Sequence, residues 1–189
     1  RTVYHIPKKR QDPSSSGTMP SEIGKLAGEL LNNPVQVSET QQEPPIDQVD
    51  QMVLIVEQQR KRQLLAELFA DSKMKRVIVF TRTKRGADRV AKYLEQAGVT
   101  AAAIHGDKSQ GQRERALASF KAGQARAMVA TDIAARGIDV DGVTHVVNFE
   151  LPNVPEAYVH RIGRTARAGA TGSAISLCSD DERSLLKDI

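Results

Sequence analysis

Hydrophobic and polar residues alternate in a regular way only after about residue 45. Short apolar runs, such as VIVF at 77–80, are separated by longer stretches whose apolar residues recur every three or four positions. A short continuous apolar run is typical of a strand buried on both faces, and the longer period is typical of an amphipathic helix. Strands are predicted at 51–57, 76–81, 100–104, 126–131, 142–150 and 172–179. Helices are predicted at 58–71, 84–98, 109–123, 154–167 and 180–189.

Strand and helix therefore alternate about five times, which predicts an α/β sandwich with a mainly parallel sheet. In such sheets, ligands bind beyond the carboxyl ends of the strands. The loops that follow VIVFT, AAAIH, MVAT and VVNFE are thus the places where a site is expected.

The first 45 residues lack this regular pattern. SEIGKLAGELL at 21–31 predicts one short helix, which Ser21 can cap. Pro34, Pro44 and Pro45 then interrupt regular structure and indicate a linker. A domain boundary is predicted between residues 45 and 46.

Composition narrows the class of protein. The chain has 189 residues, enough for one domain with additional chain, and 40% of them are hydrophobic. No apolar run approaches the ~20 residues of a membrane span, so no membrane partner is expected. The formal net charge of +4 favours an anionic partner. Aromatic residues make up 4% and tryptophan is absent, which argues against a platform that stacks single-stranded bases.

The single cysteine, Cys178, lies in the apolar run GSAISLCS. It cannot form an internal disulfide, and no metal-ligating residues cluster around it, so a core position and no metal site are predicted. Because the sequence also shows no signal peptide, a cytoplasmic location is expected.

The loops at the predicted strand ends share hydroxyl groups, glycines and basic side chains. Hydroxyls and helix N-termini suit phosphate oxygens, glycines let a backbone approach closely, and arginine presents a planar fork to phosphate. Each residue alone has an ordinary explanation: a solvated helix start for Lys84 and Arg85, or a helix cap for Asp132. Their joint occurrence at one edge of the sheet favours phosphate binding.

HRIGRTARAG at 160–169 places Arg161, Arg164 and Arg167 three residues apart. An exposed helix stripe explains this spacing about as well as phosphate chemistry does. No phosphate-binding loop of the form G-x-x-x-x-G-K-[ST] occurs in the chain. Groups that could stabilise a phosphoryl transfer are thus present without the loop that would bind the nucleotide. That combination favours an arginine finger, which reaches into a nucleotide site built by another module.

Four motifs also carry a family resemblance: VIVFTRTK, HGDKSQGQRERAL, VATDIAARGIDV and HRIGRTARAG, in that order. They resemble the motifs of the second RecA-like domain of DEAD-box RNA helicases, and the match is closest to the bacterial RhlE-like group. The resemblance covers roughly 46–189 and implies a RecA-like three-layer sandwich. It identifies residues 1–45 with the tail of a first RecA-like domain and a linker, either folded or disordered.

The resemblance implies a role for individual residues. Arg164 and Arg167 would be arginine fingers on the γ-phosphate of ATP, and His160 and Arg161 would couple that site to the other domain. Gly137 and Asp139 would lie against the ribose and phosphates of ATP. Positions near the RNA backbone would be Thr83, Gly86, Gly106, Gln110, Arg113, Thr131 and Arg136.

The resemblance further implies the C-terminal half of an ATP-dependent RNA helicase. Its partners would be RNA, bound with little sequence specificity, and the first RecA-like domain, which would hold most of the ATP and Mg²⁺. The chain alone would neither hydrolyse ATP nor unwind RNA, and no tightly bound cofactor is expected. Two alternatives stay open: an ATP-independent module that binds RNA or protein, and a helicase-like domain of a DNA-translocating protein.

Overall fold

The computed structural model describes residues 21–31, 33–35, 37, 48–136, 138, 140–167 and 171–189. The chain divides into two units, residues 1–41 and 42–189, and each is described by itself. The predicted boundary after residue 45 lies outside the described residues. In the first unit, helix α1 spans Ser21–Leu30, as its apolar period predicts. Leu26 and Leu30 on this helix are about half exposed.

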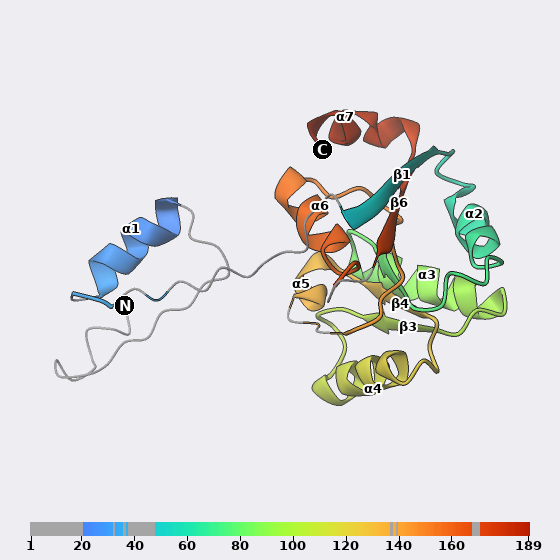
Figure 1. The fold of residues 1–189 in the computed structure, drawn as a ribbon, viewed down its shortest axis with the longest axis horizontal. Coiled ribbons are helices and arrows are strands. Elements are labelled where there is room, and N and C mark those ends of the chain that lie inside the picture. The colour runs from blue at the N-terminus through green and yellow to red at the C-terminus, as the bar shows by residue number, and fades with distance from the viewer. Residues whose placement is uncertain are drawn as a thin grey trace. The chain divides into compact units, whose positions relative to one another are not determined.

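The second unit is organised around one six-stranded sheet (Figure 1). The strands lie in the order β1-β6-β5-β2-β4-β3, and every neighbouring pair is parallel. The predicted α/β class with a parallel sheet is therefore confirmed. The strands are β1 (Val49–Ile55), β2 (Val77–Phe80), β3 (Ala101–Ile104), β4 (Ala127–Ala130), β5 (His145–Asn148) and β6 (Gly172–Cys178).

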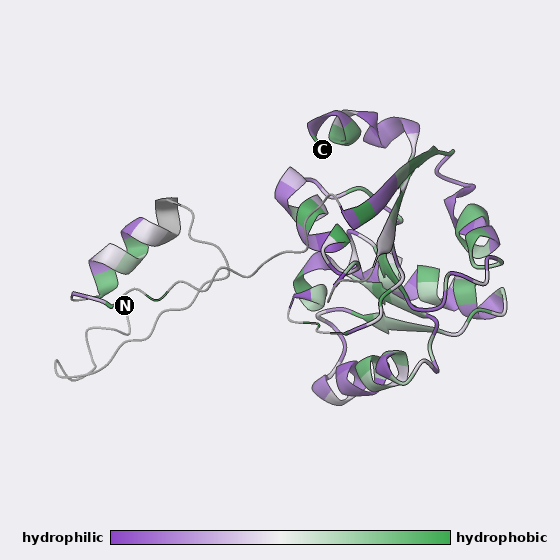
Figure 2. Ribbon diagram, viewed as in Figure 1, coloured by the Kyte–Doolittle hydropathy of each residue, from purple (hydrophilic) through white to green (hydrophobic). Residues whose placement is uncertain are grey.

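Helices cover both faces of the sheet, so the architecture has three layers (Figure 1). The helices are α2 (Lys61–Leu68), α3 (Lys84–Gln96), α4 (Gln110–Lys121), α5 (Asp132–Ala135), α6 (Pro155–Ile162), the 3₁₀ turn η3 (Asp180–Glu182) and α7 (Arg183–Asp188). Side chains alternate in β2: Val77 and Val79 pack with α2 and α3, whereas Ile78 and Phe80 pack with α4 and α5. Figure 2 shows hydrophobic residues along the central strands and polar residues on the outer helix surfaces.

Helix α6 is shorter than its sequence pattern predicts, because it ends at Ile162 rather than at residue 167. Gly163 is the C-terminal cap of the helix. Two residues later, the hydroxyl of the buried Thr165 donates to the carbonyl of Val143, and the chain leaves the helical path. Ala166 then adopts a φ of 54°, a left-handed conformation that no helix accepts. Residues 163–166 therefore lie in a turn.

Two smaller differences concern the lengths of elements. The four-residue helix α5 was not predicted, because a single turn is too short to show an apolar period. Strand β5 covers only His145–Asn148 of the predicted 142–150, and the residues after it form the loop that the site uses. Cys178 is fully buried, so its predicted core position is confirmed.

Candidate functional site

Four loops that the sequence marked lie at one edge of the sheet. Because all strands are parallel, their carboxyl ends meet there, and the register pairs Phe80 with Ala130 and Asn148, and Ala130 with Ile104. The residues that follow these ends are thus brought side by side. The grouping that was inferred from residue types is present in the fold.

The loop after β2 is held in one conformation by its own hydrogen bonds. Thr83 caps α3 with extended backbone, and its Oγ1 accepts from the amide of Gly86 at 3.0 Å. A Cβ at position 86 would lie 2.8 Å from that oxygen, so a glycine suits the position. The amide of Arg82 donates to the Glu150 carboxylate at 2.7 Å, which ties this loop to the one after β5.

The loop after β3 is fixed by a buried histidine. His105 is 3% exposed, and its Nδ1 accepts from the amide of Asp107 at 3.3 Å, so a neutral ring carries its proton on Nε2. Nε2 lies 3.0 Å from Asp88 Oδ1, although not in hydrogen-bond geometry. Desolvation acts to raise the pKa of Asp88, but His105 and Lys108 hold that pKa below its ordinary value.

The other predicted RNA positions near β3 are accessible. Gly106 is exposed and faces Lys84, whose ammonium pairs with Asp107 at 2.6 Å. Gln110 is exposed at the start of α4, and its amide donates to Glu114 at 2.8 Å. Arg113, one turn into α4, is partly buried.

Arg161 organises the centre of the edge. It is 1% exposed, and its Nε and Nη2 donate to the two carboxylate oxygens of Asp132 at 2.6 and 2.9 Å. Its Nη1 donates to Asn148 Oδ1 at 3.1 Å and to the carbonyl of Glu150 at 2.7 Å. The guanidinium carbon lies 5.1 Å from the centre of the Phe80 ring. One buried side chain thus joins α6 to the ends of β2, β4 and β5.

The other two arginines of the motif have different surroundings. Arg164 is half-buried, and its guanidinium donates to the carbonyls of His160 at 3.3 Å and Ile138 at 3.2 Å. Arg167 is also half-buried and donates to the carbonyl of Gly163 at 3.0 Å. Because Arg161 is buried and α6 ends before Arg164, an exposed helix stripe is the wrong explanation of this spacing.

A small hollow lies at the junction of α5 and α6. It is lined by Phe80, Asp132, Ala135, Arg136, Ala157, His160, Arg161 and Arg164. Arg136 is exposed at the rim of this hollow. Thr131 is buried at the start of α5, and its hydroxyl makes no capping hydrogen bond to that helix. Gly137 and Asp139, which the resemblance places at ATP, lie outside the described residues.

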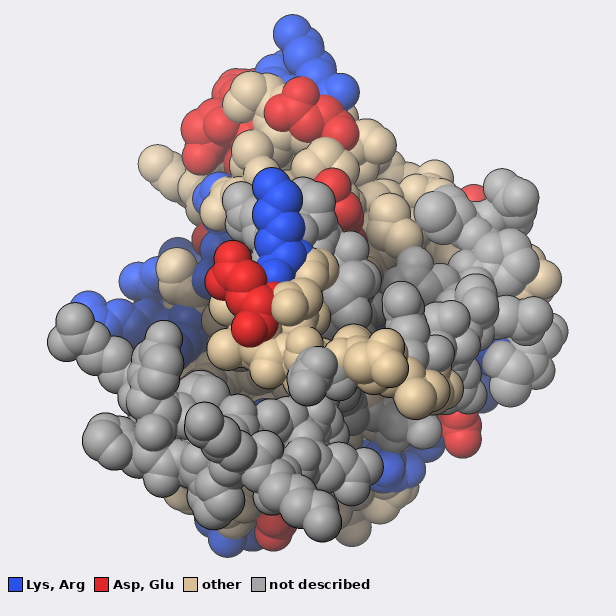
Figure 3. Space-filling view, turned by 90° about the vertical axis from the view of Figure 1, so that its left-hand side faces the viewer, with Lys and Arg blue, Asp and Glu red and all other residues tan. Residues whose placement is uncertain are grey.

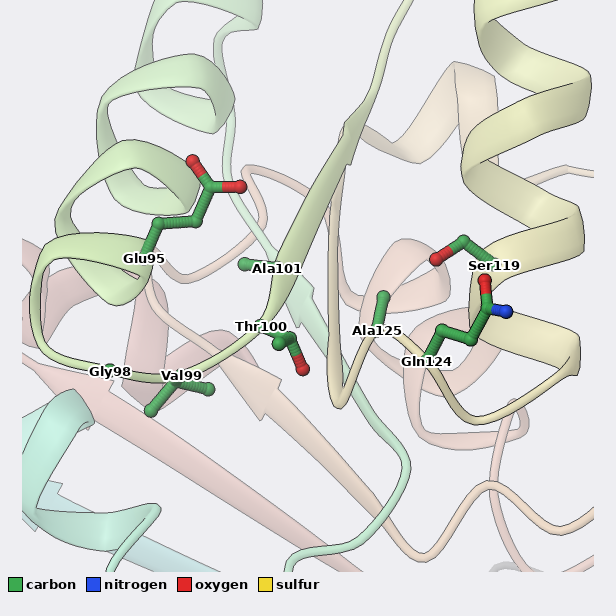
Figure 4. Close-up of a pocket in the computed structure, with 8 residues that line it drawn as sticks. All are labelled: Glu95, Gly98, Val99, Thr100, Ala101, Ser119, Gln124 and Ala125. Carbon is green, nitrogen blue, oxygen red and sulfur yellow. The ribbon is translucent and has the colours of Figure 1, made fainter.

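Two larger hollows lie at the opposite edge of the sheet, away from every predicted site residue. Figure 4 shows one of about 500 Å³, where Glu95, Thr100 and Gln124 surround the loops before β3 and β4. The other, of about 890 Å³, involves Lys73 and His145 near the amino ends of β5 and β6. Among the described residues, the first hollow is lined by no basic side chain, and the second only by Lys73 and His145. In the described part of the chain, no group of three residues could ligate a metal ion.

Several residues that build the site were not predicted. Glu150 and Asn148 come from VVNFE, where a polar residue inside an apolar strand was the available signal. Lys61 is fully buried, pairs with Glu182 and donates to the carbonyl of Phe149 at 3.0 Å. Glu182 also accepts from the amide of Leu151 at 3.1 Å. This second buried network holds the loop after β5, and nothing in the pattern of α2 pointed to it.

Comparison with known proteins agrees with this geometry. The sequence pattern of the helicase conserved C-terminal domain matches residues 60–169. The chain is 46% identical over 194 residues to the ATP-dependent RNA helicase DBP2 of Lodderomyces elongisporus, covering all of this chain and 35% of that protein. It is 42% identical over 187 residues to the DEAD-box ATP-dependent RNA helicase CshA of Bacillus subtilis, covering 99% and 38%. The chain thus spans about a third of the length of these relatives.

Solved structures show the same fold. The chain superimposes on Saccharomyces cerevisiae Dbp5 bound to RNA and ADP BeF₃ with a TM-score of 0.78, at 28% identity, over 98% of this chain and 50% of that one. It superimposes on the Escherichia coli DEAD-box protein SrmB bound to RraA with a TM-score of 0.71, at 38% identity, over 74% and 83%. The three-layer fold is therefore RecA-like, and the chain belongs to the helicase conserved C-terminal domain family, in the form found in DEAD-box RNA helicases.

Proposed function

We propose that this chain is the C-terminal half of an ATP-dependent RNA helicase and supplies arginine fingers to ATP hydrolysis. The observation that carries the proposal is the hollow between α5 and α6, on which His160, Arg164 and Arg136 converge. Its inner wall is fixed by the buried Arg161, which pairs with the partly exposed Asp132. A basic group at a rigid wall can stabilise negative charge without reorganising when that charge forms.

Arg164 and Arg167 are the proposed fingers on the γ-phosphate. Bonds from Arg164 to two main-chain carbonyls orient its guanidinium at the edge of the sheet. ATP and Mg²⁺ would be held mainly by the first RecA-like domain, with Gly137 and Asp139 of this chain completing the site. His160 and Arg161 would couple the site to that domain. The chain alone is expected to be inactive, because its sequence has no phosphate-binding loop.

The RNA groove would run along the same edge. Its proposed contacts are Thr83, Gly86, Gly106, Gln110, Arg113, Thr131 and Arg136. The ordered amides and hydroxyls after β2 and the exposed basic group after β4 suit phosphate and 2′-hydroxyl oxygens, which carry little sequence information. The related Dbp5 has been solved with RNA, which supports RNA as the ligand. Membership of the RhlE-like group and a cytoplasmic location stay predictions.

The test joins this chain to the first RecA-like domain of a close relative and measures RNA-stimulated ATP hydrolysis. Arg164→Ala should lower kcat by about 10³-fold or more, because a finger stabilises only the transition state. RNA affinity should stay within about twofold, since Arg164 is not a proposed RNA contact. Arg183→Ala, which removes an exposed arginine of α7, serves as the control.

Three results are distinguishable. A fall in kcat with intact RNA affinity supports the finger. An active protein that is indifferent to Arg164→Ala refutes it. An inactive joined protein, together with equal RNA binding by the chain alone, favours the ATP-independent binding module instead.

A further inference from the structure

Helix α3 carries a row of basic residues that the proposed function does not use. Arg85, Arg89 and Lys92 follow the spacing i, i+4, i+7, so they share one face of the helix, and all three are exposed. Arg62 of α2 adds a fourth charge, since its guanidinium carbon lies 5.7 Å from the centre of the Tyr93 ring. These four basic residues are called the α3 basic stripe below.

The stripe has no acidic counterpart. Among the described residues, no carboxylate lies within ion-pair distance of any of its four side chains. Asp88 lies three residues after Arg85 and four before Lys92, but its carboxylate is engaged by His105 and Lys108 instead. Where grey atoms do not cover it, the face in Figure 3 carries Lys and Arg as well as Asp and Glu.

An ordinary solvated helix face does not explain this arrangement well. Such faces usually mix opposite charges at i, i+4 spacing, because those pairs stabilise a helix. Arg85 and Arg89 are like charges at that spacing, which destabilises an isolated helix. An anion bound along the stripe would remove this repulsion.

The stripe begins at the candidate site. Thr83, a proposed RNA contact, caps α3, and Arg85 lies in the first turn after it. From Arg85 to Lys92 the helix rises about 10 Å, at 1.5 Å per residue, so the stripe leads away from the edge of the sheet. A chain that leaves the groove at Thr83 would therefore meet the stripe directly.

We propose that the α3 basic stripe binds the sugar-phosphate backbone of RNA that flanks the segment in the groove. This inference rests on the proposed function, since it needs RNA in the groove. Arginine and lysine would contact phosphates without reading bases, so the flank would add affinity but no sequence preference. The stripe would hold the helicase on RNAs that extend beyond the groove.

The experiment compares two RNAs on the joined two-domain protein: a short strand that fills the groove alone, and the same strand extended at both ends. Dissociation constants are measured at several salt concentrations with a non-hydrolysable ATP analogue. The stripe variant is Arg85→Gln/Arg89→Gln/Lys92→Gln. Each phosphate contact on a single strand adds about 0.7 to the slope of log K against log salt, so three lost contacts should lower the slope for the extended RNA by about 2.

A matched control removes the same total charge elsewhere. Arg115→Gln/Lys121→Gln/Lys75→Gln changes three exposed residues, two in α4 on the opposite face of the sheet and one near the amino edge. The extended RNA should keep its full salt slope with this control. Both variants should melt like the wild type, because all six side chains lie on the surface.

The outcomes separate the stripe from the groove. The proposal is supported if the stripe variant binds the short RNA normally but loses the extra affinity of the extended RNA. It is overturned if the extension still adds affinity in that variant, or if extension adds none in the wild type. Loss of the short RNA as well would place these residues in the groove and also overturn the flank assignment. A wild type that binds neither RNA refutes the proposed function itself.

Discussion

Arg161 should matter for the stability of the fold as much as for the site. Its side chain is 1% exposed and makes four hydrogen bonds, two of them to the carboxylate of Asp132. Arg161→Met would keep most of the apolar contact with the Phe80 ring. It would leave Asp132, Asn148 and the carbonyl of Glu150 without their hydrogen-bond donor. Breaking a buried ion pair by removing one member costs about 3–5 kcal/mol.

That cost must be reduced here, because the Asp132 side chain is 37% exposed and water can replace part of the pairing. Asn148, with 0% exposure, has no such access and loses a charged donor. We therefore expect the free energy of unfolding to fall by about 2–4 kcal/mol. For a domain of this size the melting temperature should fall by roughly 5–15 °C.

Urea denaturation of the isolated chain measures this change. Arg183→Met provides the comparison, because its pair with Asp180 is solvent-exposed and should contribute at most about 1 kcal/mol. Adding Asp132→Asn to Arg161→Met should restore part of the loss, since it removes the charge left without a partner. The reasoning fails if Arg161→Met unfolds within about 0.5 kcal/mol of the wild type, the range of ordinary surface substitutions.

Three further predictions concern other parts of the fold. Lys61→Met should lower the free energy of unfolding by about 2–4 kcal/mol in urea denaturation, because the buried carboxylate of Glu182 would keep only the Arg82 guanidinium at 3.6 Å as a charged partner. Burial lowers the pKa of His145 below its ordinary 6.5, so the stability this group provides is present above pH 6.5 and is lost as the pH falls through the lower folded value. His145→Gln should accordingly lose less stability than the wild type when the pH is lowered, as pH-dependent denaturation would show. Burial and the neighbouring Glu182 raise the pKa of the Cys178 thiol, so a thiol reagent should label it only on unfolding, and rapid labelling of the folded chain would contradict this.

The sequence predicted the parts of the fold whose signals are local. VIVF became β2, and the helices predicted to begin at residues 84 and 109 begin at Lys84 and Gln110. The sequence also predicted that the loops of the candidate site share one edge of the sheet, because parallel strands bring their carboxyl ends together whatever their order. The strand order itself places β6 between β1 and β5, and no local pattern encodes such a pairing.

The contacts that hold the site were harder to foresee, since they join residues far apart in the chain. Arg161 meets Asp132 across 29 positions, and Lys61 meets Glu182 across 121. Both basic residues lie in segments that also contain exposed charges, so composition could not tell which would be buried. Burial was decided by the apolar neighbours that the sheet supplies.

The end of α6 explains how three arginines at equal spacing can have unequal roles. Arg161 lies in the last turn of the helix and faces the sheet, where Phe80 and Asp132 enclose it. Had the helix continued, Arg164 would lie about 300° further round, still close to the same face, and would compete for the same buried space. Because the chain turns at Gly163, Arg164 instead reaches the hollow and is fixed there by main-chain carbonyls. Thr165→Val, which removes the hydroxyl that ties this turn to the carbonyl of Val143, should therefore lower ATP hydrolysis in the joined protein while leaving the Arg161 network intact.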